Sequence, residues 1–521
     1  MRMPSNMTHS FARVPQANVQ RSQFRSPYTW KGDINAGWLV PFLVDEVLPG
    51  DTFNDKFSIF ARLCTPIKPF IDNLYLDTFY FFVPNRLLWN NWERFNGAQD
   101  DPDDSTDYLI PQCPSPTGGY AYGSLQDFMG IPPQIEMSHN ALHTRAYNLI
   151  WNEFFRDQNL QNSVVVDKDD GPDNPDDYNH LRRGKRHDYF TSCLPWPQKG
   201  QAAALSFTGS APVYLDDSLA VRGKMLAAHD HSNPAAGNNI QTSTVGEFGI
   251  TGLPLVYDPN GSLKTDLSLA SAFTINEFRQ AFQLQMMLEM DARGGTRYVE
   301  ILRAHFGVIS PDFRLQRPEY LGGRSSRVTI NEVPQTNSSD STTPQGNLAA
   351  YGTVTSVNEG YVKSFVEHGV IIALMCVRAD LTYQQGVRRM WSRRTRYDFY
   401  WPALAHLGEQ AVLNKEIYAT GNPVWDNAVF GYQERFAEYR YCPSLIVGQL
   451  RTDAPQSLDY WHLSQDLVNP VLNAEFIQDN PPVERISAVQ NEPQFIVDVF
   501  GDLVRARPMP VFSTPGLITR L

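Results

Sequence analysis

The chain has 521 residues, of which 42% are hydrophobic, 12% aromatic and only 19% charged, and its net charge is −12. The negative charge excludes a protein that coats nucleic acid over its whole surface, so any such contact must come from local basic segments. The sequence contains no apolar run long enough to span a bilayer, which excludes a transmembrane helix.

Five scattered cysteines without CxxC spacing predict free thiols in a reducing compartment rather than disulfides or a zinc site. The N-terminal residues lack an apolar signal core, so we expect synthesis in the cytoplasm. High aromatic content and 37 prolines favour a β-rich fold with long loops and a surface that neighbouring molecules cover.

Residues 1–32 form a basic segment without Asp, Glu or clear periodicity. Its cations are Arg2, Arg13, Arg21, Arg25 and Lys31. This composition predicts an extended arm that contacts a polyanion, because several weak cationic contacts add up along a flexible chain. An arm that threads under a neighbouring subunit as a clamp is the alternative.

Strand-like runs, dense in aromatic and β-branched residues, follow at Phe57–Leu63 and Tyr75–Val83. Two acidic loops come next, Asp100–Asp107 and Asp167–Asp177. We expect solvated loops, and the alternative for Asp167–Asp177 is binding of a divalent ion between subunits. An EF-hand is excluded in the second loop because glycine already occupies its fifth position.

A helical pattern starts at Ser138 and places His139 and His143 four residues apart, a spacing that two metal-binding imidazoles can share. No Glu follows the first His, so the metalloprotease pattern fails. We therefore predict surface or interface histidines, and the pair His229 and His231 in a Gly/Asn-rich loop is weaker still as a metal site.

Residues 201–272 are rich in Gly, Ser, Asn and Ala without a lasting period, which predicts an insertion. A helix is predicted from Thr274, where Glu277 completes a capping box. A second helical segment, Tyr298–His305, follows within a predicted helical insertion over residues 273–323. Residues 334–347 have the composition of a low-complexity loop.

Strand patterns return in the C-terminal third at Gly369–Val377, Arg396–Trp401, Phe430–Tyr441 and Phe495–Phe500. No linker separates the two strand-rich ends of the chain. The sequence therefore predicts one β-sandwich whose strands come from distant segments, with long insertions between them.

Two basic stretches lie in the strand-rich regions. The first contains Arg182, Arg183, Lys185 and Arg186, and the second mixes arginines with aromatic residues. The candidate contact residues of the second stretch are Arg388, Arg389, Trp391, Arg393, Arg394 and Arg396. Such a mixture suits single-stranded nucleic acid, but Arg and Trp are also typical anchors of subunit interfaces, which we favour here.

No GxSxG, P-loop or GxGxxG motif occurs, so we predict no catalytic residue, no cofactor and no metal. The alternative is a carbohydrate-active enzyme or binding protein on a β-sandwich scaffold, which would need two carboxylates flanking a cleft.

Six long blocks resemble the major capsid proteins of gokushoviruses, a branch of the microvirus bacteriophages. They are RAYNLIWNEFFRDQNL (145–160), HDYFTSCLPWPQKG (187–200), DARGGTRYVEILRAHFGV (291–308), SPDFRLQRPEYLGG (310–323), MWSRRTRYDFYWP (390–402) and ARPMPVFSTPGL (506–517). The resemblance implies a single eight-stranded antiparallel viral jelly roll with large inserted loops and a few helices. Sixty copies would form a T=1 icosahedral shell around a circular single-stranded DNA genome.

Under this resemblance the whole chain, 1–521, is one capsid domain, with strands from about 33–100, 180–200 and 360–500. The basic arm would lie on the interior and face DNA. The insertion 201–272 would form a three-fold protrusion used in host attachment. Its candidate contact residues are Phe248, Ile250, Leu253, Leu255 and Val256.

The partners that the resemblance implies are other copies of the chain, the DNA genome, an internal scaffolding protein, a pilot protein, small DNA-binding phage proteins and a bacterial surface receptor. Membrane insertion is not expected. The mature protein would reside in the virion after assembly in the cytoplasm of the host bacterium.

Overall fold

A computed structural model describes residues 20–203, 275–309, 312, 314–339, 345–490 and 492–512, together with four short strands between 213 and 265. The chain forms two compact units. One unit contains Met1–Pro197 and Gly295–Leu521, and the other contains Gln198–Gly294. The predicted insertion 201–272 lies within the second unit, which also contains residues 275–293.

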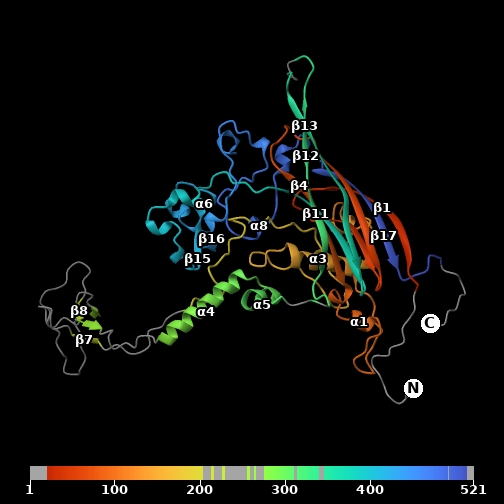
Figure 1. Cartoon of the computed structure of the whole chain (residues 1–521), viewed down its shortest axis with the longest axis horizontal. Coiled ribbons are helices and arrows are strands. Elements are labelled where there is room, and N and C mark those ends of the chain that lie inside the picture. Colours follow the sequence, from red (N-terminus) through yellow and green to blue (C-terminus); the bar gives the residue numbers. More distant parts are fainter. Residues whose placement is uncertain are drawn as a thin grey trace, which may run out of the picture. The chain divides into compact units, whose positions relative to one another are not determined.

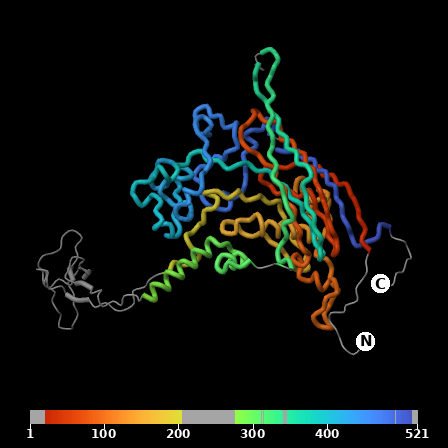
Figure 2. The backbone as a smooth tube through the Cα atoms, viewed as in Figure 1, coloured from red at the N-terminus to blue at the C-terminus, as the bar shows by residue number. Residues whose placement is uncertain are grey.

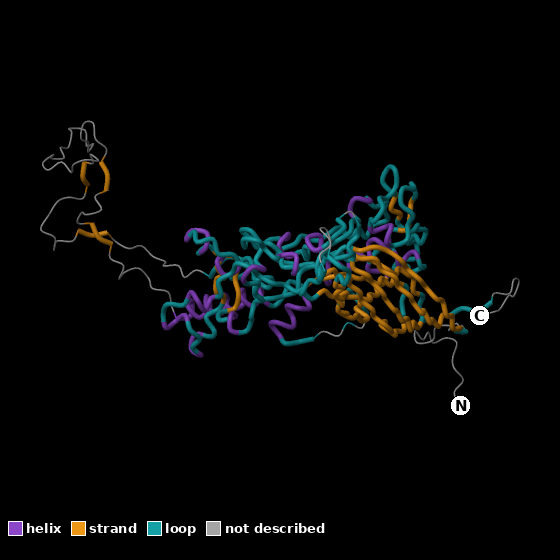
Figure 3. Tube along the Cα trace, turned by 90° about the horizontal axis from the view of Figure 1, so that it is seen from above, coloured by secondary structure: helices purple, strands orange, loops and turns teal. Residues whose placement is uncertain are grey.

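The first unit is built on two antiparallel sheets. The five-stranded sheet has the order β1 (Ser22–Ile34), β17 (Phe495–Arg507), β3 (Thr52–Leu63), β13 (Leu348–Ser364) and β12 (Thr329–Pro334). The four-stranded sheet has the order β11 (Glu319–Arg327), β4 (Leu74–Pro84), β14 (Gly369–Ala379) and β2 (Val40–Val47). Figure 3 shows these strands gathered side by side.

The strands pair in a nested order. With β12 left aside, the first strand pairs with the eighth (β1 with β17) and the second with the seventh (β2 with β14). The third pairs with the sixth (β3 with β13) and the fourth with the fifth (β4 with β11). The two ends of the chain therefore meet in one sheet, where Figures 1 and 2 show red β1 beside blue β17.

The main core lies between the two sheets. Strand β3 alternates buried and exposed residues along its length, as expected for a strand with one face in a core. The Phe57 ring of β3 lies 5.5 Å from Phe42 of β2 and 5.4 Å from Tyr80 of β4. These aromatic contacts join the sheets into a sandwich, which confirms the predicted antiparallel β-rich fold.

A second core covers the other face of the four-stranded sheet. Here α3 (Leu142–Ile150) packs against β14, and every residue of β14 is buried. Like α3, four neighbouring elements belong to the long segment between β4 and β11: α1 (Trp92–Phe95), β5 (Gln112–Pro114), α2 (Leu125–Phe128) and β6 (Ser138–Asn140). A sheet buried on both faces needs continuous apolar strands, and β14 has the sequence GVIIALMCVRA.

A third hydrophobic cluster is formed largely by the segment that connects β14 to β17 along the chain. Its hairpin pairs β15 (Glu409–Leu413) with β16 (Val429–Glu434). The single-turn helices α6 (Asn414–Ile417) and α8 (Ala474–Ile477) contribute to this cluster. The same part of the chain contains α7 (Pro423–Asp426) and α9 (Val483–Ile486), and the buried residues of α9 pack in the main core. Tyr189 and Phe190 of the distant N-terminal half complete this cluster.

The predicted helices after the insertion are confirmed as α4 (Ile275–Arg293) and α5 (Tyr298–Phe306). Thr274, the predicted cap, lies outside the described residues. In the second unit β7 (Val213–Leu215) pairs with β10 (Leu263–Thr265), and β8 (Leu226–Ala228) pairs with β9 (Leu255–Tyr257).

Several element predictions are wrong. The helix predicted from Ser138 begins at Leu142, because Ser138–Asn140 pairs with β5. Residues 180–200 contribute only isolated bridges at Arg182, Gly184 and Leu194. The strand predicted at Arg396–Trp401 starts instead with a 3-10 turn. The backbone N–H groups of Arg394 and Thr395 donate to the Asp398 carboxylate and stabilise this turn.

Strands β11, β12 and much of β13 were not predicted, because the sequence of β11, EYLGGRSSR, is poor in strand-forming residues. Pairing with β4 imposes the extended conformation. Gly323 is needed in this pairing, since a Cβ atom there would lie 2.2 Å from the Thr78 carbonyl oxygen. The predicted loop 334–347 does connect β12 to β13.

Candidate interaction surfaces

The arginine–aromatic segment, residues 388–401, divides its arginines between the interior and the surface. Arg389 Nη1 donates to the Ala411 carbonyl oxygen at 2.7 Å and to Glu416 Oε1 at 3.0 Å. Arg393 Nη2 donates to Glu438 Oε1 at 3.2 Å, and Arg388 Nη2 to a backbone carbonyl. These three guanidinium groups therefore fix the segment onto the third cluster.

The remaining side chains of the segment point outward. Trp391 is 75% exposed and Tyr397 is 65% exposed. Arg394 and Arg396 are also exposed, and the Arg396 guanidinium lies 4.4 Å from the centre of the Trp401 ring. Further exposed members are Met390, Phe399, Tyr400 and Trp401. One copy of the chain thus exposes several aromatic side chains and two arginines along this segment, which is typical of an interface.

A cavity of about 320 Å³ lies beneath this segment and contains the carboxylates of Glu416 and Glu438. Burial raises the pKa of Glu416, while Arg389 and the Tyr189 hydroxyl hold its carboxylate. Arg389 and Arg393 both approach Glu438. Because arginines occupy both carboxylates, the pair does not have the arrangement of a glycosidase acid and base.

The basic N-terminal segment is a β-strand where the structure describes it. Arg25 Nε lies 2.7 Å from Asp502, and Lys31 Nζ lies 2.9 Å from Asp498, both on the paired strand β17. Arg21 Nη2 donates to Thr52 Oγ1 at 2.6 Å. Arg2 and Arg13 lie outside the described residues. Residues 22–32 of the predicted arm are therefore extended, and pairing with β17 makes them an edge strand of the five-stranded sheet.

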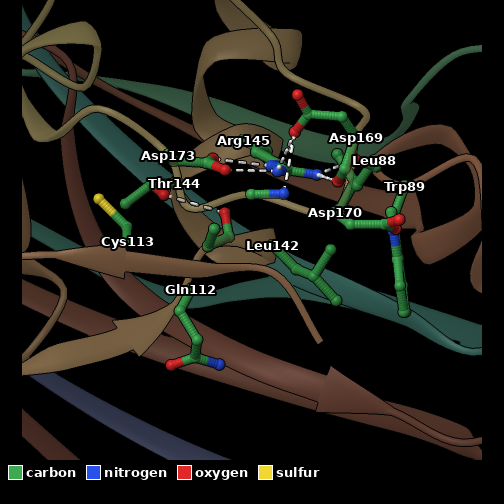
Figure 4. Close-up of polar contacts among 12 residues, drawn as sticks. Leu88, Trp89, Gln112, Cys113, Leu142, Thr144, Arg145, Asp169, Asp170 and Asp173 are labelled. Atoms are coloured by element: carbon green, nitrogen blue, oxygen red, sulfur yellow. Dashed lines mark hydrogen bonds and ion pairs between the residues drawn. The ribbon is translucent and has the colours of Figure 1, made fainter. Parts of the chain in front are cut away.

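The second acidic loop is anchored by a buried ion pair, not solvated throughout. Arg145 of α3 donates from Nε to Asp173 Oδ2 at 2.8 Å, and both side chains are fully buried. Figure 4 shows the same guanidinium donating to the backbone oxygens of Leu88 and Asp169 at 3.0 Å each. Asp170 in turn accepts from Trp89 Nε1 at 2.7 Å. Only part of the loop faces solvent.

The predicted histidine pair is held by protein groups. His139 Nε2 lies 2.8 Å from the Tyr120 hydroxyl, and His143 Nε2 lies 3.8 Å from Glu46 Oε1. Burial lowers the pKa of both imidazoles. Within the described part of the chain, no group of three or more His, Cys, Asp or Glu side chains is placed to hold a metal ion. His229 and His231 lie outside the described residues.

The basic stretch after the acidic loop supports the interior. The Arg182 guanidinium lies 4.2 Å from the centre of the Trp38 ring, and Arg183 pairs with Asp77 at 2.5 Å. The Lys185 ammonium lies 4.5 Å from the centre of the Phe476 ring. Burial lowers the pKa of Lys185 to about 8. These contacts explain Arg182, Arg183 and Lys185 without a nucleic acid, whereas Arg186 is exposed.

The predicted contact residues of the insertion are only partly visible. Leu255 and Val256 belong to β9, whereas Phe248, Ile250 and Leu253 lie outside the described residues. On α4 the predicted apolar row includes Phe282 and Met286, which are largely exposed. The helix therefore presents apolar side chains to its surroundings rather than burying them in a core.

The outer face of the five-stranded sheet was missed as a surface of interest. Phe60 of β3 is 46% exposed, and Phe500 and Ile496 of β17 are 49% and 63% exposed. The available signal was the alternation in FIVDVFGDLVRAR, which places every second residue on one face. The alternation predicts the strand, but it does not show whether other elements of the chain pack on the exposed face.

All five cysteines are free thiols, as predicted. None of the described helices combines the length and apolarity needed to cross a membrane.

Residues 12–517 match the family described as "Capsid protein (F protein)". The chain is 49% identical to capsid protein VP1 of Bdellovibrio phage phiMH2K, over 98% of each chain. It is 43% identical to capsid protein VP1 of Chlamydia phage 1, over 99% of each chain. Identity to capsid protein VP1 of Spiroplasma virus 4 is 38%, over 98% of this chain and 97% of that one. The chain therefore belongs to the phage F capsid protein family of the microviruses and is a structural protein of the virion, not an enzyme.

Proposed function

We propose that sixty copies of this chain form a T=1 icosahedral shell that encloses a circular single-stranded DNA genome. The observation that carries the proposal is full-length similarity to three phage capsid proteins. The exposed aromatic surface of the arginine–aromatic segment supports it, since a surface of this kind is stable in water only when another molecule covers it.

The wall of this shell would be an eight-stranded jelly roll. The nested pairing of first with eighth, second with seventh, third with sixth and fourth with fifth strand supports that fold, because a jelly roll is a long antiparallel hairpin rolled into two sheets. Strand β12 would be an additional edge strand that extends the five-stranded sheet.

The test of assembly replaces Trp391 with Ala in the full-length chain. Tyr122→Ala is the matched control, because Tyr122 is 73% exposed against 75% for Trp391 and lies outside the segment. We expect closed shells for the wild type and the control, expressed alone or with the phage partners, in electron micrographs and sedimentation. Trp391→Ala should remain as folded small oligomers. A wild-type chain that stays monomeric at high concentration contradicts the proposal.

The basic residues Arg2, Arg13, Arg21, Arg25 and Lys31 are proposed to lie on the interior of the shell and contact DNA. Polyanion contacts weaken with salt because counterions compete for the phosphates. Replacing Arg2, Arg13, Arg21 and Arg25 together with Gln should therefore lower DNA retention in a salt-sensitive way. If DNA retention at high salt is unchanged, the alternative remains, in which the N-terminal arm only clamps beneath a neighbouring copy.

Residues 201–272 are proposed to form a surface protrusion in which three copies meet and attach to the host. The contact residues would be Phe248, Ile250, Leu253, Leu255 and Val256. Deleting residues 205–268 with a short Gly/Ser bridge should give shells that assemble but no longer adsorb to cells. Normal adsorption of such shells would refute this role.

The proposed partners during assembly are an internal scaffolding protein, a pilot protein and small DNA-binding phage proteins. A bacterial surface receptor would bind the finished virion. Co-expression of the chain with each candidate protein, followed by purification of the shells, would show which of them associate.

A further inference from the structure

The outer face of the five-stranded sheet has the composition of a platform for unpaired bases. Along β3 the side chains of Lys56, Ser58, Phe60 and Arg62 point outward, so one aromatic ring lies between two cations on this strand. On the adjacent strand β17, Phe500 lies opposite Ser58, one outward position from Phe60. Diagonal neighbours of this kind are close enough for aromatic side chains to form one surface.

Both rings are available for contact in the described part of the chain. Phe60 and Phe500 are about half exposed, while their strand neighbours Ile59 and Val499 are buried in the core. The rings therefore stand on a rigid base, and truncating them would remove little from the core of the sandwich. Every base has an aromatic face, so such rings stack on single-stranded DNA with little regard to sequence.

The net charge of the outward residues on this face is positive, whereas the net charge of the whole chain is negative. The outward residues include four cations, Arg25, Lys31, Lys56 and Arg62, against three carboxylates, Asp33, Asp498 and Asp502. The chain carries −12 overall.

Arg25 and Lys31 pair with Asp502 and Asp498. Among the described residues, no carboxylate lies in ion-pair contact with Arg62. Lys56 lies opposite Asp502, whose pKa is lowered by Arg25 and also by the charge of Lys56. Arg62 therefore remains available for a phosphate, and Lys56 adds positive charge on the same face.

Two further features favour DNA over a second copy of the chain. The hydroxyls of Thr29, Ser58 and Thr355 lie on the same face, where they can donate to phosphate oxygens. Strand β1 at the edge of the sheet continues directly from the acid-free residues 1–21, which add Arg2, Arg13 and Arg21. A basic arm and a basic sheet face would thus act on one strand of DNA.

From these observations we infer that Phe60 and Phe500, with Lys56 and Arg62, form a sequence-independent site that stacks and holds a segment of single-stranded DNA. The inference rests on the proposed enclosure of a DNA genome, and it assigns the sheet face that contacts that genome.

The test compares wild-type full-length protein with Phe60→Ala/Phe500→Ala, using fluorescein-labelled dT20 and fluorescence anisotropy. Both proteins are measured before assembly into shells, so that added dT20 can reach the sheet face. Base stacking on an aromatic ring contributes enough affinity that the double variant should bind dT20 at least about ten-fold more weakly. Binding to a dT20·dA20 duplex should change little, since its bases are already stacked. Phe60→Tyr/Phe500→Tyr keeps the rings and should retain wild-type affinity for dT20.

Shell formation by each variant is measured in parallel, together with its unfolding midpoint. Reduced dT20 binding by a folded, assembling Ala variant supports the site. Unchanged dT20 binding by that variant overturns it, as does a wild-type chain that does not bind dT20. Loss of assembly with unchanged dT20 binding also overturns it and assigns the face to a second copy. A wild-type chain that binds dT20 but never forms shells would instead refute the proposed function.

Discussion

The two sheets of the sandwich share one core but differ in what lies on their outer faces. The four-stranded sheet is covered by α3 and its neighbouring segments, so β14 is buried at every position. Among the described residues no element covers the outer face of the five-stranded sheet, and β17 alternates buried with exposed residues along most of its length. The long segment between β4 and β11 supplies the cover on one side only. The covered side therefore contributes stability, and the open side remains free for contact.

The buried ion pair beneath the cover gives the sharpest test of this contrast. Arg145→Met leaves the Asp173 carboxylate buried without its cation, and breaking a pair of this kind costs about 3–5 kcal/mol. We expect a correspondingly lower free energy of unfolding by chemical denaturation. Asp173→Asn should be milder because the amide oxygen still accepts from Arg145. A loss below about 1 kcal/mol for Arg145→Met would show that the cover is not held by this pair.

Two matched isoleucines compare the faces directly. Ile372 of β14 is fully buried toward the cover, whereas Ile496 of β17 is 63% exposed. Ile372→Ala should lower the free energy of unfolding by about 2–5 kcal/mol. Ile496→Ala should change it by no more than about 0.5 kcal/mol. Equal effects in urea titrations would mean that the open face is covered in the folded monomer.

His180 makes the covered side sensitive to acid. Its ring stacks on Trp38 at a centroid distance of 5.0 Å, Nε2 lies 3.0 Å from the Leu39 carbonyl oxygen, and burial lowers its pKa from 6.5 to about 4. Between pH 6.5 and pH 4, the His180 imidazole is therefore protonated in the unfolded chain but neutral in the folded chain. Stability should fall by up to about 3 kcal/mol as the pH drops through that window.

The control for this pH effect is His180→Gln, which keeps a hydrogen-bond donor but cannot titrate. Unfolding midpoints measured from pH 7 to pH 4 should decline less steeply for the variant than for the wild type. Parallel declines in the two proteins would assign the acid sensitivity to other groups.

The ion pairs of the open face should have the smallest effect. Lys31 and Asp498 pair at 2.9 Å but remain largely exposed, and exposed pairs contribute about 0.5 kcal/mol or less. Lys31→Met/Asp498→Asn should therefore leave the thermal unfolding midpoint almost unchanged. A marked loss of stability would indicate that β1 is held to β17 by charge rather than by backbone pairing.

Sequence periodicity predicted the strands with the clearest patterns. The continuous apolar run of β14 and the alternation of β17 are local features, because a side chain's face follows directly from its position along a strand. Helices α4 and α5 were predicted for the same reason. The free cysteines and the capsid family also followed from the sequence.

Tertiary structure alone decided the roles of the charged residues. Arg183 and Arg145 appeared as ordinary basic residues, yet their partners Asp77 and Asp173 lie 106 and 28 residues away along the chain. Strand β11 is extended only because β4 lies beside it. Whether a face is covered depends on where a distant insertion folds back, and short-range patterns carry no information about that. Pairing across long sequence separations therefore determined which arginines hold the fold and which face the surroundings.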